Sequence, residues 1–185
     1  MVRFQPARLT RCALVVTLCV ISSLFSRYAQ GTVPFSLLPF VVVLAGWLLS
    51  PREAFWSMLT YILLGLVGLP VFASPPFGGP VYLFKPSFGF LLGFILGAFF
   101  ISVFKNREFF RKDMLGVIFL SELGMLLVYL PGLFYLWLAF SFFMGKPIGF
   151  NRVLQIGFYP FLGFDVLKAF LAGMLFWKIK TRITV

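Results

Sequence analysis

Histidine is absent from this sequence of 185 residues. Its absence removes the commonest general base and the commonest metal ligand, so histidine-based triads, Cys–His dyads and zinc-protease motifs are excluded. Acidic residues are also few, with five aspartates and glutamates against 16 lysines and arginines. The serines and threonines therefore lack an evident activating base. We expect a protein that is not an enzyme and holds neither a metal nor a cofactor.

Charged residues make up only 11% of the chain, whereas hydrophobic residues make up 61%. A soluble domain of this length could not bury so much apolar surface, because small domains leave a large fraction of their surface in water. A phosphate-binding G-x-x-x-x-G-K-[ST] loop is also missing, so the chain has no recognisable means of hydrolysing ATP. The composition predicts one membrane domain, residues 1–185, of all-α class.

Six apolar runs have nearly the length that a helix needs to cross a bilayer. Pro131-Gly132 predicts the end of the fifth run, because a single helix from residue 114 to residue 144 would exceed the thickness of the hydrocarbon core. We therefore expect a hydrophobic outer segment at 131–159, with Tyr135–Met144 lying on the membrane surface or dipping into it. The six predicted spans are 11–28, 33–50, 54–73, 86–104, 114–130 and 160–177.

The distribution of basic residues predicts the orientation of these spans. Most of the 16 lysines and arginines fall on the side that holds both termini, and a bias of this kind marks the cytoplasmic side of membrane proteins. The N- and C-termini are therefore predicted to be cytoplasmic. The net charge of +11 reflects this topology, and we do not expect nucleic acid as a partner.

Asp165 and Lys168 interrupt the otherwise apolar stretch 160–177. Residues three apart share one face of a helix, so the carboxylate and the ammonium should lie together. Each ionisable group at membrane depth costs about 2.5–3.5 kcal/mol on insertion scales, and such groups by default mark a binding site or a pathway. With Pro160 in the first turn of the helix, the pair is expected near the outer face. The alternative is a structural ion pair buried between helices.

The other four acidic residues of the chain are expected to have roles different from that of Asp165. Glu53, Glu108 and Asp113 lie near basic residues or the start of a helix, which predicts solvated or capping roles. Glu122 lies within the fifth span, where a structural role and a site role are equally compatible with the sequence.

Gly89, Gly93 and Gly97 form a G-x-x-x-G-x-x-x-G ladder on the fourth span. Small residues four apart let a neighbouring helix approach closely, so close packing is the first interpretation. Just before the ladder, residues 85–90 bring a lysine, a serine and two aromatic rings to the outer end of the same helix. This group is a further candidate wall for a ligand.

Four stretches of the sequence carry recognisable motifs, namely residues 33–39, 65–73, 86–94 and 157–169. They resemble segments of the BioY family, the biotin-binding membrane subunits of energy-coupling-factor (ECF) transporters. Residues 33–39 resemble the family's V-P-F-T-L-Q opening of the second helix. The other three stretches resemble, in order, its G-x-x-G-L-P-V-F-A, P-T-G-G-Y-L-L-G-F and G-x-x-P-F-x-P-G-D-x-x-K-A segments.

The resemblance implies high-affinity biotin capture and uptake in a bacterial cytoplasmic membrane. It makes Asp165 and Lys168 the substrate-contacting acid and lysine. A carboxylate can accept the ureido N–H groups of biotin, whereas Lys168 could meet either the ureido carbonyl or the ligand carboxylate. Phe35, Phe90 and Tyr159 would bury the apolar parts of biotin.

The resemblance also implies further contacts. Gly89 would lie in the substrate-binding segment. Ala13 and Thr17, a small-x-x-x-small pair on the first span, would contact a partner helix. The implied partners are a transmembrane coupling subunit and a pair of ABC-type ATPases.

Two other functions are compatible with the residues. In a proton-coupled secondary transporter, Glu122 or Asp165 would relay protons and the Asp165–Lys168 pair would be the coupling site. In a membrane scaffold protein, the same pair would be only structural.

Overall fold

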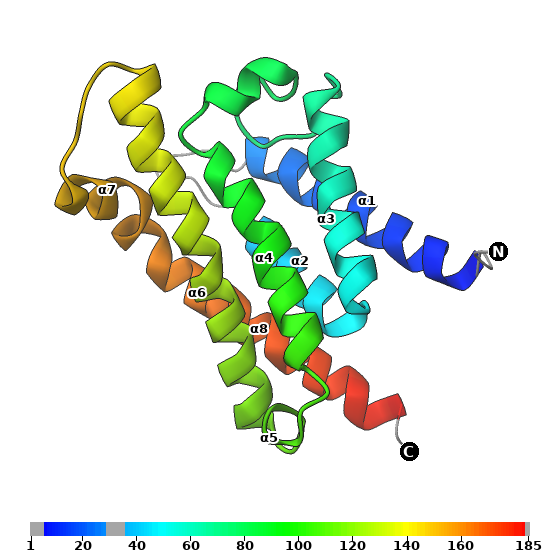
Figure 1. Ribbon diagram of the computed structural model, residues 1–185. Coiled ribbons are helices and arrows are strands. Elements are labelled where there is room, and N and C mark those ends of the chain that lie inside the picture. The colour runs from blue at the N-terminus through cyan, green and yellow to red at the C-terminus, as the bar shows by residue number, and fades with distance from the viewer. Residues whose placement is uncertain (1–5, 29–35, 184–185) are drawn as a thin grey trace.

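The computed structural model describes residues 6–28 and 36–183, and all regular secondary structure within these ranges is helical. Six helices of 11 residues or more follow one another in the order of the six predicted spans (Figure 1). They are α1 (Pro6–Tyr28), α2 (Leu38–Leu48), α3 (Pro51–Leu66), α4 (Phe88–Phe104), α6 (Met114–Leu138) and α8 (Tyr159–Ile183). Four short elements connect them: the 3-10 helix η1 (Pro80–Phe84), α5 (Glu108–Arg111), the π-helix η2 (Ala139–Phe143) and α7 (Phe150–Gly157).

The outside of the bundle is apolar. Leu14, Leu115 and Leu130 are 59%, 75% and 66% exposed, and many other large apolar side chains are exposed with them. Three segments are long and apolar enough to cross a membrane, namely Pro6–Tyr28, Met114–Phe143 and Tyr159–Arg182, and α2 and α4 are shorter apolar helices. Exposed apolar area of this extent requires lipid rather than water. The all-helical membrane class is therefore confirmed.

The glycine ladder brings α4 against α6, its most extensive neighbour (Figure 1). A Cβ atom on Gly89 would lie 2.2 Å from the Tyr135 Cβ, and one on Gly93 would lie 2.3 Å from the Val128 carbonyl oxygen. Side chains do not approach so closely, so both positions require glycine. The interpretation of the ladder as a close-packing motif is confirmed.

The predicted end of the fifth span at Pro131 is wrong. Helix α6 continues through Pro131 to Leu138 and runs on as the π-helix Ala139–Phe143. Proline removes one backbone hydrogen bond, but neighbouring helices can hold such a helix together in a membrane. Here Gly89 packs on the turn that contains Pro131, and the Tyr135 hydroxyl donates a hydrogen bond to the Leu83 carbonyl.

The expected segment Tyr135–Met144 is not a separate element, because its residues continue α6 and the π-helix. Leu136 and Ala139 are buried inside the bundle. The predicted outer segment 131–159 therefore consists of the end of α6, the π-helix, a turn and the short helix α7.

Two further span boundaries need correction. The second span was expected at 33–50, but α2 covers only Leu38–Leu48, and residues 33–35 lie outside the described ranges. The third span was expected at 54–73, but α3 ends at Leu66. Beyond it, Phe72 folds back, and a Cβ atom on Gly65 would lie 2.1 Å from the Phe72 ring. Val71 and Phe72 are buried in the loop after α3, whereas Val67 and Leu69 are exposed. Hydropathy cannot distinguish an apolar loop of this kind from a helix.

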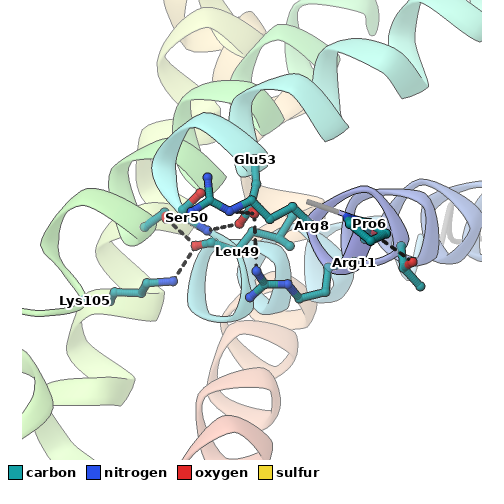
Figure 2. Close-up of polar contacts among 9 residues, drawn as sticks. Pro6, Arg8, Arg11, Leu49, Ser50, Glu53 and Lys105 are labelled. Carbon is teal, nitrogen blue, oxygen red and sulfur yellow. Dashed lines mark hydrogen bonds and ion pairs between the residues drawn. The ribbon is translucent and has the colours of Figure 1, made fainter. Parts of the chain in front are cut away.

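A polar cluster holds α1 against the turn between α2 and α3, as Figure 2 shows. Ser50 and Glu53 form a capping box at the start of α3, with the Ser50 amide donating to Glu53 Oε2 at 2.8 Å. Arg8 and Arg11 of α1 lie 3.9 and 3.4 Å from Glu53 Oε1. The capping role expected for Glu53 is confirmed.

Lys105 joins the same corner to the end of α4 (Figure 2). Its ammonium donates to the Trp47 carbonyl at 2.9 Å and to the Leu49 carbonyl, so it satisfies acceptors at the C-terminal end of α2. Asp113, as expected, caps α6 by accepting a hydrogen bond from the Gly116 amide at 2.7 Å.

Candidate functional site

A cavity of about 430 Å³ lies between α2, α4, α6 and α8, at the end of the bundle opposite the Glu53 corner. Its volume is within the range of small-molecule sites in proteins. Most of its wall is apolar, and the loop after α3 closes part of it. Apolar lining residues include Leu38, Phe72, Leu91, Phe94, Val128, Leu136 and Phe161.

Asp165 and Lys168 both line this cavity. Lys168 Nζ lies 2.8 Å from Asp165 Oδ1, and the two residues are only 6% and 7% exposed, respectively. Helix α8 begins at Tyr159, with Pro160 in its first turn as expected, and this start places both side chains on the cavity face. The expected proximity of the pair is confirmed, and the pair has a cavity beside it.

Tyr129 of α6 is the third member of this group, and sequence reasoning missed it. Its hydroxyl donates a hydrogen bond to Asp165 Oδ2 at 2.6 Å, and it lines the cavity. Its ring packs edge-to-face on Phe90 and Phe158, with centroids 6.0 and 4.9 Å away. The available signal was that Tyr129 is the one residue with a polar group in the apolar run 123–130.

This arrangement suits a ligand with N–H donors. An ionised carboxylate offers about four acceptor positions, and Tyr129 and Lys168 occupy two of those on Asp165. Hydrogen bonds from a ligand to the remaining positions would be charge-assisted, and they would form in a buried, largely apolar setting. The Lys168 ammonium is a donor for a carbonyl oxygen.

A second polar group is formed by the loop before η1, by η1 itself and by the turn between η1 and α4. Lys85 Nζ donates to the Ser74 hydroxyl at 2.8 Å, and Ser74 shares a hydrogen bond with the Tyr82 hydroxyl at 3.0 Å. Ser74, Tyr82 and Ser87 line the cavity. Lys85 is half-buried, and this burial lowers the pKa of its ammonium.

Hydrogen bonds from α1 and α3 hold the loop that carries Ser74. The Arg27 guanidinium donates to the Phe72 carbonyl at 3.0 Å and lies 4.3 Å from the centre of the Phe77 ring. The Tyr61 hydroxyl donates to the Val71 carbonyl at 3.2 Å. The cavity wall is therefore fixed by residues distant in the sequence.

The other residues proposed from sequence are placed differently. Phe90 lines the cavity, whereas Gly89 packs on α6 and is not among the lining residues. Tyr159 is 61% exposed and is also not among them. Phe35 lies outside the described residues. The structure thus brings Asp165, Lys168 and Phe90 together.

Glu122 and the α1 pair lie away from the cavity. Glu122 is half-buried on α6, two helical turns from Tyr129, and has no hydrogen bond or ion pair among the residues that the structure describes. Ala13 and Thr17 are exposed on the outer face of α1.

Comparison with known proteins gives the family. The model of the BioY family matches residues 1–184. "Biotin transporter BioY" of Thermotoga maritima is 31% identical over 90% of this chain and 92% of its own length. "Probable biotin transporter BioY" of Pyrococcus horikoshii is 34% identical over 85% of this chain and 86% of its own length.

A solved structure has the same fold. It is the "Crystal structure at 2.1 A of the S-component for biotin from an ECF-type ABC transporter". It superposes with a TM-score of 0.75, at 22% sequence identity, over 98% of this chain and 95% of the other. From the family match and the relatives together, the chain belongs to the BioY family.

Proposed function

We propose that this BioY-family chain is the substrate-specific subunit of an ECF transporter and captures biotin for uptake. The observation that carries the proposal is the buried Asp165–Lys168 pair beside a cavity of ligand size. The names of the relatives, and the biotin S-component that shares the fold, support biotin as the substrate.

In the proposed complex, Asp165 accepts the ureido N–H groups of biotin and Lys168 donates to the ureido carbonyl. Tyr129 holds the Asp165 carboxylate in place from the other side. Phe90, Leu91 and the neighbouring apolar wall bury the bicyclic ring and the valeryl chain. Gly89 supports this wall through its contact with α6, and Tyr159 and Phe35 have no assigned contact.

In the membrane, α1, α2, α3, α4, α6 and α8 would form six crossings, with both termini on the cytoplasmic side of a bacterial cytoplasmic membrane. The basic residues around the Glu53 corner and at the end of α8 support this orientation. The cavity then opens near the outer face.

Transport would need partners, because the chain has no ATP-binding loop of its own. A transmembrane coupling subunit and a pair of ABC-type ATPases would fill this role. The exposed face of α1 around Ala13 and Thr17 is the proposed contact surface, because small side chains there permit a close helix–helix approach.

Equilibrium binding tests the substrate. The purified chain in detergent is titrated with biotin by calorimetry, with thiamine and riboflavin as competitors. We expect saturation at one biotin per chain, with no displacement by either competitor. Absence of biotin binding, or equal displacement by all three vitamins, would overturn the proposal.

A further inference from the structure

The ammonium of Lys85 has no counter-charge among the acidic side chains of the protein. The chain has five acidic residues, all within the described ranges, and none lies within 4 Å of Lys85 Nζ. One of its N–H groups donates to Ser74, and the other two have no acceptor among the described residues. A half-buried cation without a counter-charge is stabilised by an anion beside it, so this ammonium is a candidate anion-binding group.

The Ser74 and Tyr82 hydroxyls complete the group. They are hydrogen-bonded to each other at 3.0 Å, both line the cavity, and Tyr82 is only 4% exposed. Their mutual hydrogen bond uses one of the two hydroxyl protons, so the other can turn to donate to an incoming oxygen atom. Lys85 is not itself among the lining residues, but its ammonium contacts the lining residue Ser74 at 2.8 Å. The group therefore places a positive charge and one free hydroxyl proton next to one end of the cavity.

This group and the Asp165 group lie at different depths. Gly89, close to the Lys85 turn, packs on Tyr135, whereas Asp165 is held by Tyr129. Tyr135 and Tyr129 are six residues apart on α6, which corresponds to about 9 Å along the helix. Figure 1 shows the start of α4 and the end of α6 at the same end of the bundle. The wall between the two levels includes the apolar side chains Phe90 and Leu91.

We propose that Lys85, Ser74 and Tyr82 form an anion subsite that binds the carboxylate of the ligand. The inference rests on the proposed function and adds the orientation of the substrate, with the ureido ring at Asp165 and the carboxylate at the Lys85 turn. A ligand with a polar ring, an apolar chain and a terminal anion matches the order of groups along the cavity.

Lys168 is the competing site for the carboxylate, and electrostatics disfavours it. Its charge is balanced by Asp165 at 2.8 Å, so the pair has no net charge. A ligand carboxylate beside Lys168 would add a second negative charge next to Asp165, and two neighbouring carboxylates repel each other when ionised. Lys85 has no such neighbour.

The test combines a change in the ligand with a change in the protein. Binding of biotin and of biotin amide, which lacks the negative charge, is measured for the wild type and for Lys85→Met. The wild type should prefer biotin by about tenfold or more, as expected for a charge-assisted contact. Lys85→Met should bind both ligands equally, with an affinity for the amide close to that of the wild type.

Two variants serve as controls. Lys146→Met removes an exposed lysine that has no hydrogen bond to Ser74 or Tyr82 and should keep the full preference. Lys85→Arg keeps the charge and should also keep the preference. If Lys85→Met is too unstable to purify, Lys85→Gln replaces it, because the amide can still donate to Ser74.

The outcomes separate the subsite from the proposed function. Loss of the preference in Lys85→Met alone supports the subsite. An undiminished preference in that variant, or its loss in Lys168→Met only, refutes the subsite while biotin capture stands. A wild type that binds neither ligand refutes the proposed function itself.

Discussion

Asp165→Asn is the most informative single substitution, because it removes one negative charge with almost no change in shape. The Asp165 carboxylate is 7% exposed and accepts hydrogen bonds from Tyr129 and Lys168. An asparagine can still accept with its oxygen atom, so the cavity keeps its volume. The substitution therefore tests the charge rather than the packing.

The structure predicts that Asp165→Asn changes both the affinity for biotin and the stability of the protein, by different amounts. A hydrogen bond to a charged group contributes about 1 kcal/mol more than a neutral one, so the loss of charge assistance in one or two ureido hydrogen bonds weakens biotin binding by roughly five- to thirtyfold. Stability should fall more, because removal of one partner of a buried ion pair costs about 3–5 kcal/mol. The Lys168 ammonium, only 6% exposed, would lose its counter-charge.

Calorimetric titration with biotin and thermal unfolding in the same detergent measure the two effects separately. The double variant Asp165→Asn with Lys168→Met removes the uncompensated cation, so it should regain stability without regaining biotin binding. Asp113→Asn is the matched control, since asparagine and aspartate cap helices equally well. Wild-type affinity in a folded Asp165→Asn protein would refute the reasoning and favour a structural pair.

Three further substitutions test other parts of the molecule. Tyr129→Phe should weaken biotin binding about tenfold without unfolding, because the ring contacts remain while the 2.6 Å hydrogen bond to Asp165 is lost; equal or tighter binding by calorimetry would contradict this. Glu122→Gln should leave biotin uptake into cells unchanged, and uptake lost together with its proton dependence would favour a proton-coupled transporter. Lys105→Met should lower the melting temperature, because it removes the donor to two carbonyl groups. Burial lowers the pKa of Lys105 to about 8. Between that pH and the ordinary pKa of lysine, Lys105 holds its proton more often in the unfolded chain than in the folded one, so the free energy of unfolding of the wild type rises with pH. The difference in this free energy between the wild type and Lys105→Met should therefore widen between about pH 8 and pH 10. A narrowing would contradict the assignment.

The sequence was sufficient to predict the helical class and the central pair. Asp165 and Lys168 were found because ionisable groups are conspicuous in an apolar run and because their spacing fixes a shared face. The glycine ladder was interpreted correctly for a similar reason, since small residues four apart have one common use in membrane helices. In each case a single helix contained the whole signal.

Tertiary contacts decided what the sequence could not show. Pro131 is a local breaker, but the contact of Gly89 with its turn keeps α6 helical beyond it. Phe72 is apolar enough for a span, yet its ring fills the space beside Gly65 and the chain there is a loop. Tyr129 is inconspicuous until α8 places Asp165 beside it. Each of these features depends on a partner outside its own helix or turn.

The cavity does not run through the whole length of the bundle. The cavity reaches Phe94 and Met125, and beyond these residues α4 and α6 close together, with Gly97 packed against Gly124.

A layer of polar and aromatic side chains lies beyond Gly97 and Gly124, farther from the cavity. The Trp47 indole donates to the Ser121 hydroxyl at 2.9 Å and stacks on Phe176 with centroids 4.4 Å apart, and Leu120 is fully buried beside Ser121 on α6. A ligand bound at Asp165 therefore has no open route inward between the described helices. In the orientation proposed above, release on the cytoplasmic side would require movement of helices or of the whole bundle. Interiors packed at this density resist deformation, so this movement would have a substantial free-energy cost.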